Sequence, residues 1–79
     1  MLGTVRAYDE DEGCGAVAPD GGGPDAWFHF AQIEMDGFRA LAPGDRVEFD
    51  DVRRTEEPGF ALQVTGGIRK VPVPVNPAG

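Results

Sequence analysis

Apolar and polar side chains alternate in several short stretches of the chain, which is the pattern of half-buried β-strands. The clearest stretch is residues 46–50, where Val47 and Phe49 stand between charged residues. In residues 60–64 the apolar side chains again share one face of a predicted strand, and we expect that face in the core. Those side chains are Phe60, Leu62 and Val64.

Residues 25–30 form the densest aromatic run of the chain and predict another strand, since aromatic residues favour strands. Alternation divides the run between two faces, with Ala26, Phe28 and Phe30 on one and Trp27 and His29 on the other. We expect one face to belong to the core. The aromatic residues on the other face, which carries Trp27 and His29, then require a role other than packing in the core.

Twelve glycines and seven prolines divide the chain into short segments that leave little room for helices. Two more strands are predicted over residues 2–8 and 13–18, on either side of an acidic turn at residues 9–12. The connection over residues 31–42 is long and irregular, with at most one helical turn around residues 31–33. A turn is expected within this connection, at residues 36–37.

Five short strands with a long connection after the third predict an all-β fold, a small five-stranded antiparallel barrel of the OB type. A charged loop over residues 51–57 is expected between the last two strands. We expect the barrel to occupy residues 1–67 and a Pro-rich tail to occupy residues 68–79, because closely spaced prolines remove the donors that a strand needs.

The balance of basic and acidic residues restricts the classes of ligand that the chain can bind. Seven Lys and Arg residues against 14 Asp and Glu residues give a net charge of −7, which argues against tight, purely electrostatic binding to duplex DNA.

Cys14 is the one cysteine, so an internal disulfide is excluded and a cytoplasmic location is expected. The apolar runs are too short to cross a membrane. Because the chain contains no serine that His29 could activate, we expect no catalysis, and also no cofactor or metal.

Six short segments occur in an order and spacing that resemble those of the cold-shock domain family. They are Gly3-Thr4-Val5-Arg6, Gly13-x-Gly15, Pro19-Asp20-Gly21-Gly22, Phe28-His29-Phe30, Met35-Asp36-Gly37-Phe38-Arg39 and Gly44-Asp45-Arg46-Val47-Glu48-Phe49. The resemblance covers about residues 3–66 and leaves the Pro-rich tail outside. It implies a five-stranded OB barrel that binds single-stranded RNA or DNA.

The resemblance also implies which side chains contact the nucleic acid. In this family unpaired bases stack on exposed aromatic side chains of neighbouring strands, while a few basic groups follow the phosphates. The matching residues here are Arg6, Tyr8, Trp27, His29, Phe30 and Phe38. Arg39 and Arg46 are weaker candidates for phosphate contacts, since acidic neighbours such as Glu48 are able to pair with them.

Other positions of the family pattern carry different side chains. Three aromatic positions are occupied by Ala7, Cys14 and Ala16, and a basic position is occupied by Glu12. Each missing stack removes about 1–3 kcal/mol of binding, so the resemblance predicts weak binding with little sequence preference. The alternative is a degenerate barrel that serves as a protein interaction or dimerisation module, through the Trp27 face or the Pro-rich tail.

Overall fold

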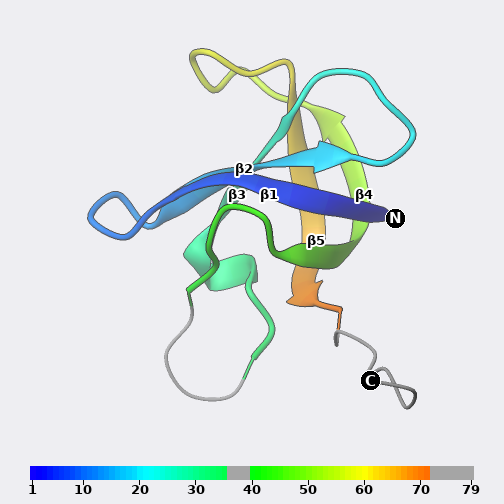
Figure 1. The fold of residues 1–79 in the computed structure, drawn as a ribbon. Helices are drawn as coiled ribbons and strands as arrows, with labels where there is room; N and C mark the ends of the chain where they lie inside the picture. Colours follow the sequence, from blue (N-terminus) through cyan, green and yellow to red (C-terminus); the bar gives the residue numbers. More distant parts are fainter. Residues whose placement is uncertain (36–39, 72–79) are drawn as a thin grey trace.

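The computed structural model describes residues 1–35 and 40–71, which contain five strands and one short 3-10 helix (Figure 1). The elements are β1 (Leu2–Asp9), β2 (Cys14–Pro19), β3 (Ala26–His29), η1 (Phe30–Gln32), β4 (Arg46–Arg54) and β5 (Leu62–Lys70). The all-β prediction is therefore confirmed. Phe38, the expected turn at residues 36–37 and residues 72–79 of the tail lie outside the described residues.

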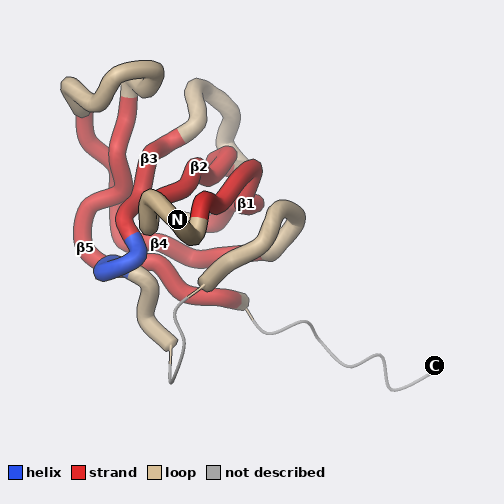
Figure 2. Tube along the Cα trace, turned by 90° about the vertical axis from the view of Figure 1, so that its left-hand side faces the viewer, coloured by secondary structure: helices blue, strands red, loops and turns tan. Residues whose placement is uncertain are grey.

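The five strands close into a barrel in the order β1-β2-β3-β5-β4, with β4 returning to β1 (Figure 2). Four of the pairings are antiparallel, as predicted. The pairing of β3 with β5 is parallel and short, joining Ala26 to Leu62 and Trp27 to Gln63. These two strands are far apart in sequence, so no tight turn forces them to run in opposite directions.

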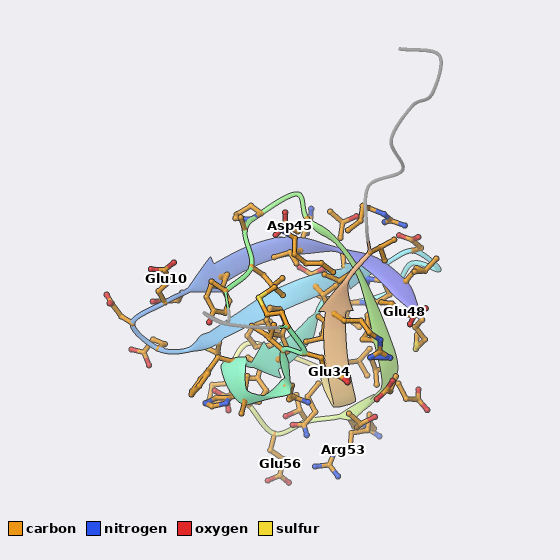
Figure 3. The ribbon with its side chains drawn as sticks, turned by 90° about the horizontal axis from the view of Figure 1, so that it is seen from below. Glu10, Glu34, Asp45, Glu48, Arg53 and Glu56 are labelled. Atoms are coloured by element: carbon orange, nitrogen blue, oxygen red, sulfur yellow. The ribbon has the colours of Figure 1, made fainter. Side chains whose placement is uncertain are left out.

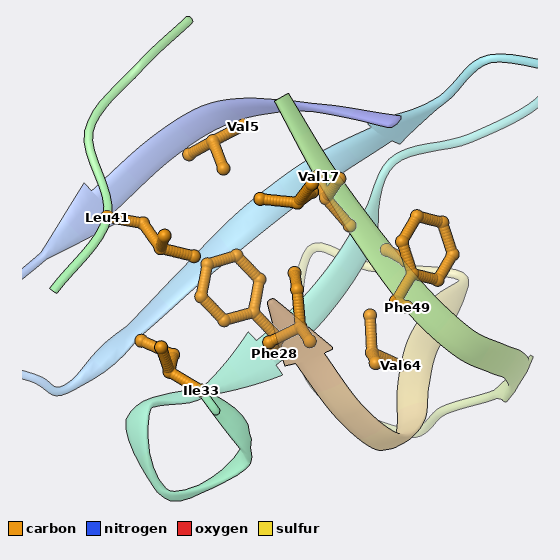
Figure 4. Packing of buried hydrophobic residues seen from close by; sticks show 10 residues of the cluster. Val5, Val17, Phe28, Ile33, Leu41, Phe49 and Val64 are labelled. Carbon is orange, nitrogen blue, oxygen red and sulfur yellow. The ribbon is translucent and has the colours of Figure 1, made fainter. Parts of the chain in front are cut away.

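The barrel encloses one core to which every strand contributes (Figure 4). Alternation in β4 is confirmed, because Val47 and Phe49 are fully buried while their charged neighbours are exposed. In β3 the same holds for Ala26 and Phe28, which are fully buried. Burial of these rings and branched side chains is the main stabilising contribution available to so small a barrel.

The loop between the last two strands begins and ends later than the predicted loop over residues 51–57. Strand β4 continues to Arg54, and β5 begins at Leu62 rather than at residue 60. Phe60 therefore precedes the strand and is only half-buried, which corrects its assignment to the core. Val64, by contrast, is in the core as predicted.

Strand β5 also extends past residue 67, where the barrel was expected to end. The register between β4 and β5 shifts at the pair Gly66 and Gly67, opposite Asp50. Gly66 has a φ of 75°, and the Gly67 N–H donates to Asp50 Oδ2 at 2.8 Å. The strand continues through this irregularity to Ile68, which is fully buried. Such bulges are not visible in a simple alternation, so the pattern of residues 60–64 does not predict the continuation of the strand.

Candidate nucleic-acid interface

The outer face of β2 and β3 carries the first two rings of the candidate site. Trp27 lies opposite Ala16 and His29 lies opposite Cys14, and partners in an antiparallel pair project to the same side. Both rings are half-exposed, with centroids 6.2 Å apart and an interplanar angle of 46°. The prediction that Trp27 and His29 share a face away from the core is therefore confirmed.

Phe30 joins these rings although simple alternation would place it in the core with Phe28. The strand ends at His29, and η1 begins at Phe30, so the side chain turns outward and is 43% exposed. Its ring centroid lies 4.6 Å from that of His29. We call Trp27, His29 and Phe30 the ring cluster.

The Phe30 ring packs closely against the backbone of Gly13. Its carbonyl accepts from the Phe30 N–H at 2.7 Å, and a Cβ at Gly13 would approach Phe30 Cδ1 to 2.8 Å. Gly13 also has a φ of 68°, which side chains rarely adopt. A glycine at the end of the acidic turn thus allows the aromatic ring to lie against the backbone.

The His29 imidazole is held by the start of η1. Its Nδ1 accepts from the Ala31 N–H at 3.2 Å, while the His29 N–H donates to Gln32 Oε1 at 2.9 Å. Gln32 in turn donates to the Val64 carbonyl at 2.8 Å, which links the turn to β5. Because Nδ1 accepts, a neutral imidazole carries its proton on Nε2, and this N–H can donate to a base or a phosphate.

Tyr8 lies apart from the ring cluster. It pairs with Gly15 and packs against the core, its ring 6.0 Å from that of Phe28 and nearly parallel to it. Burial, followed by the charges of Glu10 and Cys14, raises the pKa of the Tyr8 phenol above its ordinary 10.0. The structure therefore places Tyr8 with Phe28, on the side of the sheet opposite Trp27.

The arginines named as phosphate candidates are engaged with carboxylates where the structure describes them. Arg6 is exposed at an irregularity of β1, and its Nε lies 3.3 Å from Asp25 Oδ2. Arg46 forms a bidentate ion pair with Asp20, in which Nη1 lies 2.7 Å from Oδ1 and Nη2 lies 2.5 Å from Oδ2. Its partner is thus Asp20 rather than Glu48. Arg39 and Phe38 lie outside the described residues.

Small residues occupy the rest of the outer face. Ala7, Ala16 and Trp27 are neighbours in one cross-strand row, and Cys14 precedes Ala16 on the same side of β2. Ala16 is only 7% exposed, whereas Cys14 is partly exposed. Cys14 consequently leaves an open position beside His29, and Ala16 does not.

Two further members of this row, Gln63 and Arg53, were not predicted from the sequence. Trp27 pairs with Gln63 of β5, and Gln63 pairs with Arg53 of β4, so Arg53 continues the row on which Trp27 lies. Arg53 had been assigned to a charged loop, because β4 was expected to end before it. Counting β4 through the register shift between Phe49 and Asp51 would have placed it on a strand.

Among residues 1–35 and 40–71, no group of three or more His, Cys, Asp or Glu side chains is placed to hold a metal ion. Over the same residues, no helix is long and apolar enough to cross a membrane. What this face offers chemically is a set of aromatic rings beside hydrogen-bond donors.

A family model described as the 'Cold-shock' DNA-binding domain matches residues 1–66. The chain belongs to the cold-shock domain family. Proteins of this family generally bind single-stranded nucleic acid and are not enzymes. The five-stranded barrel is the fold expected for a cold-shock domain.

Curated relatives are similar over most of the barrel. The cold shock-like protein CspA of Stigmatella aurantiaca is 45% identical over 51 residues, covering 65% of this chain and 75% of the relative. Cold shock-like protein CspD of Escherichia coli is 44% identical over 48 residues, covering 61% and 65%. Cold shock-like protein CspE of Escherichia coli is 37% identical over 61 residues, covering 77% and 88%. The chain thus spans slightly less than two thirds of CspD and more of the other two.

Proposed function

We propose that this cold-shock domain binds single-stranded RNA or DNA weakly and with little sequence preference, by stacking bases on the ring cluster. The observation that carries the proposal is the adjacency of three partly exposed rings, with successive centroids 6.2 and 4.6 Å apart. Every base has a flat face, so stacking tolerates any sequence. Trp27 offers the largest surface for it.

An acidic chain is compatible with this mode of binding. The net charge of −7 weakens attraction for phosphates, but stacking depends less on neutralising them. Arg6 supplies a cation at the rim, where its exposed ion pair with Asp25 contributes little stability and exchanges readily for a phosphate contact. Tyr8 supports the barrel from the Phe28 side and is not part of the proposed stacking surface.

The experiment that tests this function is a titration of a fluorescently labelled pyrimidine oligonucleotide, followed by anisotropy at low salt. We expect saturable binding that an unlabelled single strand competes away and a duplex of equal length does not. A duplex that competes as well as the single strand would contradict recognition by stacking, because paired bases are not free to leave their own stack.

The same rings would also serve a protein interface, and this is the competing function. It is favoured by the small residues at Ala7, Cys14 and Ala16, which reduce the stacking area. On that account the chain would form a homodimer through the Trp27 face, or through the Pro-rich tail, of which residues 72–79 lie outside the described residues. A gel-filtration mass well above 8.4 kDa that falls on Trp27→Ala would favour the interface.

Cys14→Phe is expected to strengthen binding of the labelled strand about fivefold, which corresponds to about 1 kcal/mol for one additional stack. The side chain would lie beside His29 on the open part of the outer face. Ala16→Phe is the matched variant: Ala16 is buried, so a large ring there is expected to lower the melting temperature. Unchanged affinity in a folded Cys14→Phe variant would contradict stacking beside His29.

A further inference from the structure

Most of the described cations are bound to carboxylates. Over residues 1–35 and 40–71, the ion pairs are Arg6 with Asp25, Arg46 with Asp20, Lys70 with Asp45, and Arg69 with Glu34, Glu48 and Asp50. Among the Arg and Lys side chains of these residues, Arg53 and Arg54 alone have no carboxylate partner. A phosphate that contacts either one displaces no ion pair.

Arg53 is nevertheless held in place, by a neutral group. With the Gln63 amide oxygen turned toward it, Arg53 donates from Nη2 at 2.9 Å and from Nε at 3.0 Å, while the amide nitrogen donates to Thr55 Oγ1 at 2.6 Å. We assign this orientation because in the reverse one, although the Thr55 hydroxyl would donate to the amide oxygen at 2.6 Å, the amide nitrogen would face the N–H donors of Arg53. A guanidinium has five N–H donors, so Gln63 leaves others free to point into solvent.

The position of Arg53 relative to the ring cluster follows from the strand register. Trp27, Gln63 and Arg53 occupy neighbouring positions on β3, β5 and β4, so two strand spacings, about 10 Å, separate Trp27 from Arg53. Figure 3 shows Arg53 at the edge of the molecule opposite Asp45. Arg54 belongs to a different row, since its partner Leu62 packs against the core.

We infer that Arg53, oriented by Gln63, binds a backbone phosphate of the strand whose bases stack on Trp27. The inference rests on the proposed function. It extends the proposed interface from the outer face of β2 and β3 across β5 to β4. Two of its features support a phosphate ligand: a guanidinium binds phosphate oxygens through paired N–H groups, and Gln63 holds this one without neutralising it.

The test is the salt dependence of oligonucleotide binding by Arg53→Gln. Loss of one phosphate contact to a single strand makes the slope of log K against log salt shallower by about 0.7. We expect this change, together with an affinity loss of up to about fivefold at low salt. Arg53→Lys keeps the charge and is expected to keep the slope of the unaltered protein.

Lys70→Gln is the matched control, because it removes the same charge from the neighbouring strand β5 at a residue already paired with Asp45. Its slope is expected to equal that of the unaltered protein. Equal slopes for Arg53→Gln and the unaltered protein, or equal changes in both Gln variants, would overturn the inference. If the unaltered protein does not bind the strand at all, it is the proposed function that fails.

Gln63→Glu tests whether Arg53 must be free of a carboxylate, without removing the guanidinium. The new carboxylate would lie where the amide oxygen now accepts from Arg53, and would neutralise it in place. We expect the slope to change as in Arg53→Gln, with the barrel still folded by its melting curve. A slope like that of the unaltered protein would show that the charge of Arg53 does not enter a phosphate contact.

Discussion

Replacing Trp27 by alanine is expected to weaken the binding of a short pyrimidine oligonucleotide by about 5- to 150-fold. One lost stack is worth about 1–3 kcal/mol, and Trp27 is the largest ring of the cluster. The indole lies at the centre of the proposed interface, between His29 on its own strand and Gln63 on the next. The measurement is the anisotropy titration of a labelled strand.

Leu2→Ala provides the control for that loss. Leu2 is also a large apolar side chain, 45% exposed, but it lies on β1 opposite Glu48 of β4, away from the ring cluster. Its removal is expected to leave affinity unchanged. Equal losses in the two variants would mean that general changes in the surface, rather than stacking on Trp27, determine binding.

Phe28→Ala is expected to unfold most of the protein. Phe28 is fully buried, and a Phe-to-Ala change in a core costs about 3–5 kcal/mol. A chain of this size seldom has more than about 3–5 kcal/mol of stability in total. Urea denaturation followed by circular dichroism would therefore show little or no folded baseline for this variant.

The matched variant is Phe30→Ala, which makes the same chemical change two residues later. Phe30 is 43% exposed and lies on the ring cluster, so the variant is expected to fold but to bind the oligonucleotide more weakly. The opposite result, a folded Phe28→Ala and an unfolded Phe30→Ala, would reverse the assignment of core and interface.

The sequence predicted those parts of the fold that follow from regular alternation. Val47 and Phe49 in β4, and Trp27 and His29 in β3, lie on the predicted faces because period two decides the side in any uninterrupted strand. The resemblance to the cold-shock domain family implied, in addition, that the strands form a five-stranded barrel. Together they placed two of the three rings of the cluster on one face.

Interruptions of the strands account for what the sequence did not predict. Phe30 leaves the core side because η1 begins there, and its outward position depends on a contact with Gly13, distant in sequence. The continuation of β5 through Gly66 and Gly67 depends on Asp50 of the opposite strand. Such long-range contacts cannot be read from local propensity.

Arg53 illustrates the same difficulty for the site. Its charged surroundings in sequence resemble a solvated loop, whereas the strand register brings it into the row of Trp27. Arg6 and Arg46, two of the arginines named from the sequence, have carboxylate partners, and only the structure shows that Gln63, an amide, faces Arg53. Total charge does not distinguish the arginines with carboxylate partners from Arg53, whereas the structure does.

The most direct test of the account uses the intrinsic fluorescence of Trp27, which is the one tryptophan in the chain. During titration of the unaltered protein with a short pyrimidine oligonucleotide at low salt, stacking of a base on the indole is expected to change its emission to a saturating end point. Emission that stays constant up to millimolar strand would contradict the claim that this cold-shock domain binds single-stranded nucleic acid through Trp27.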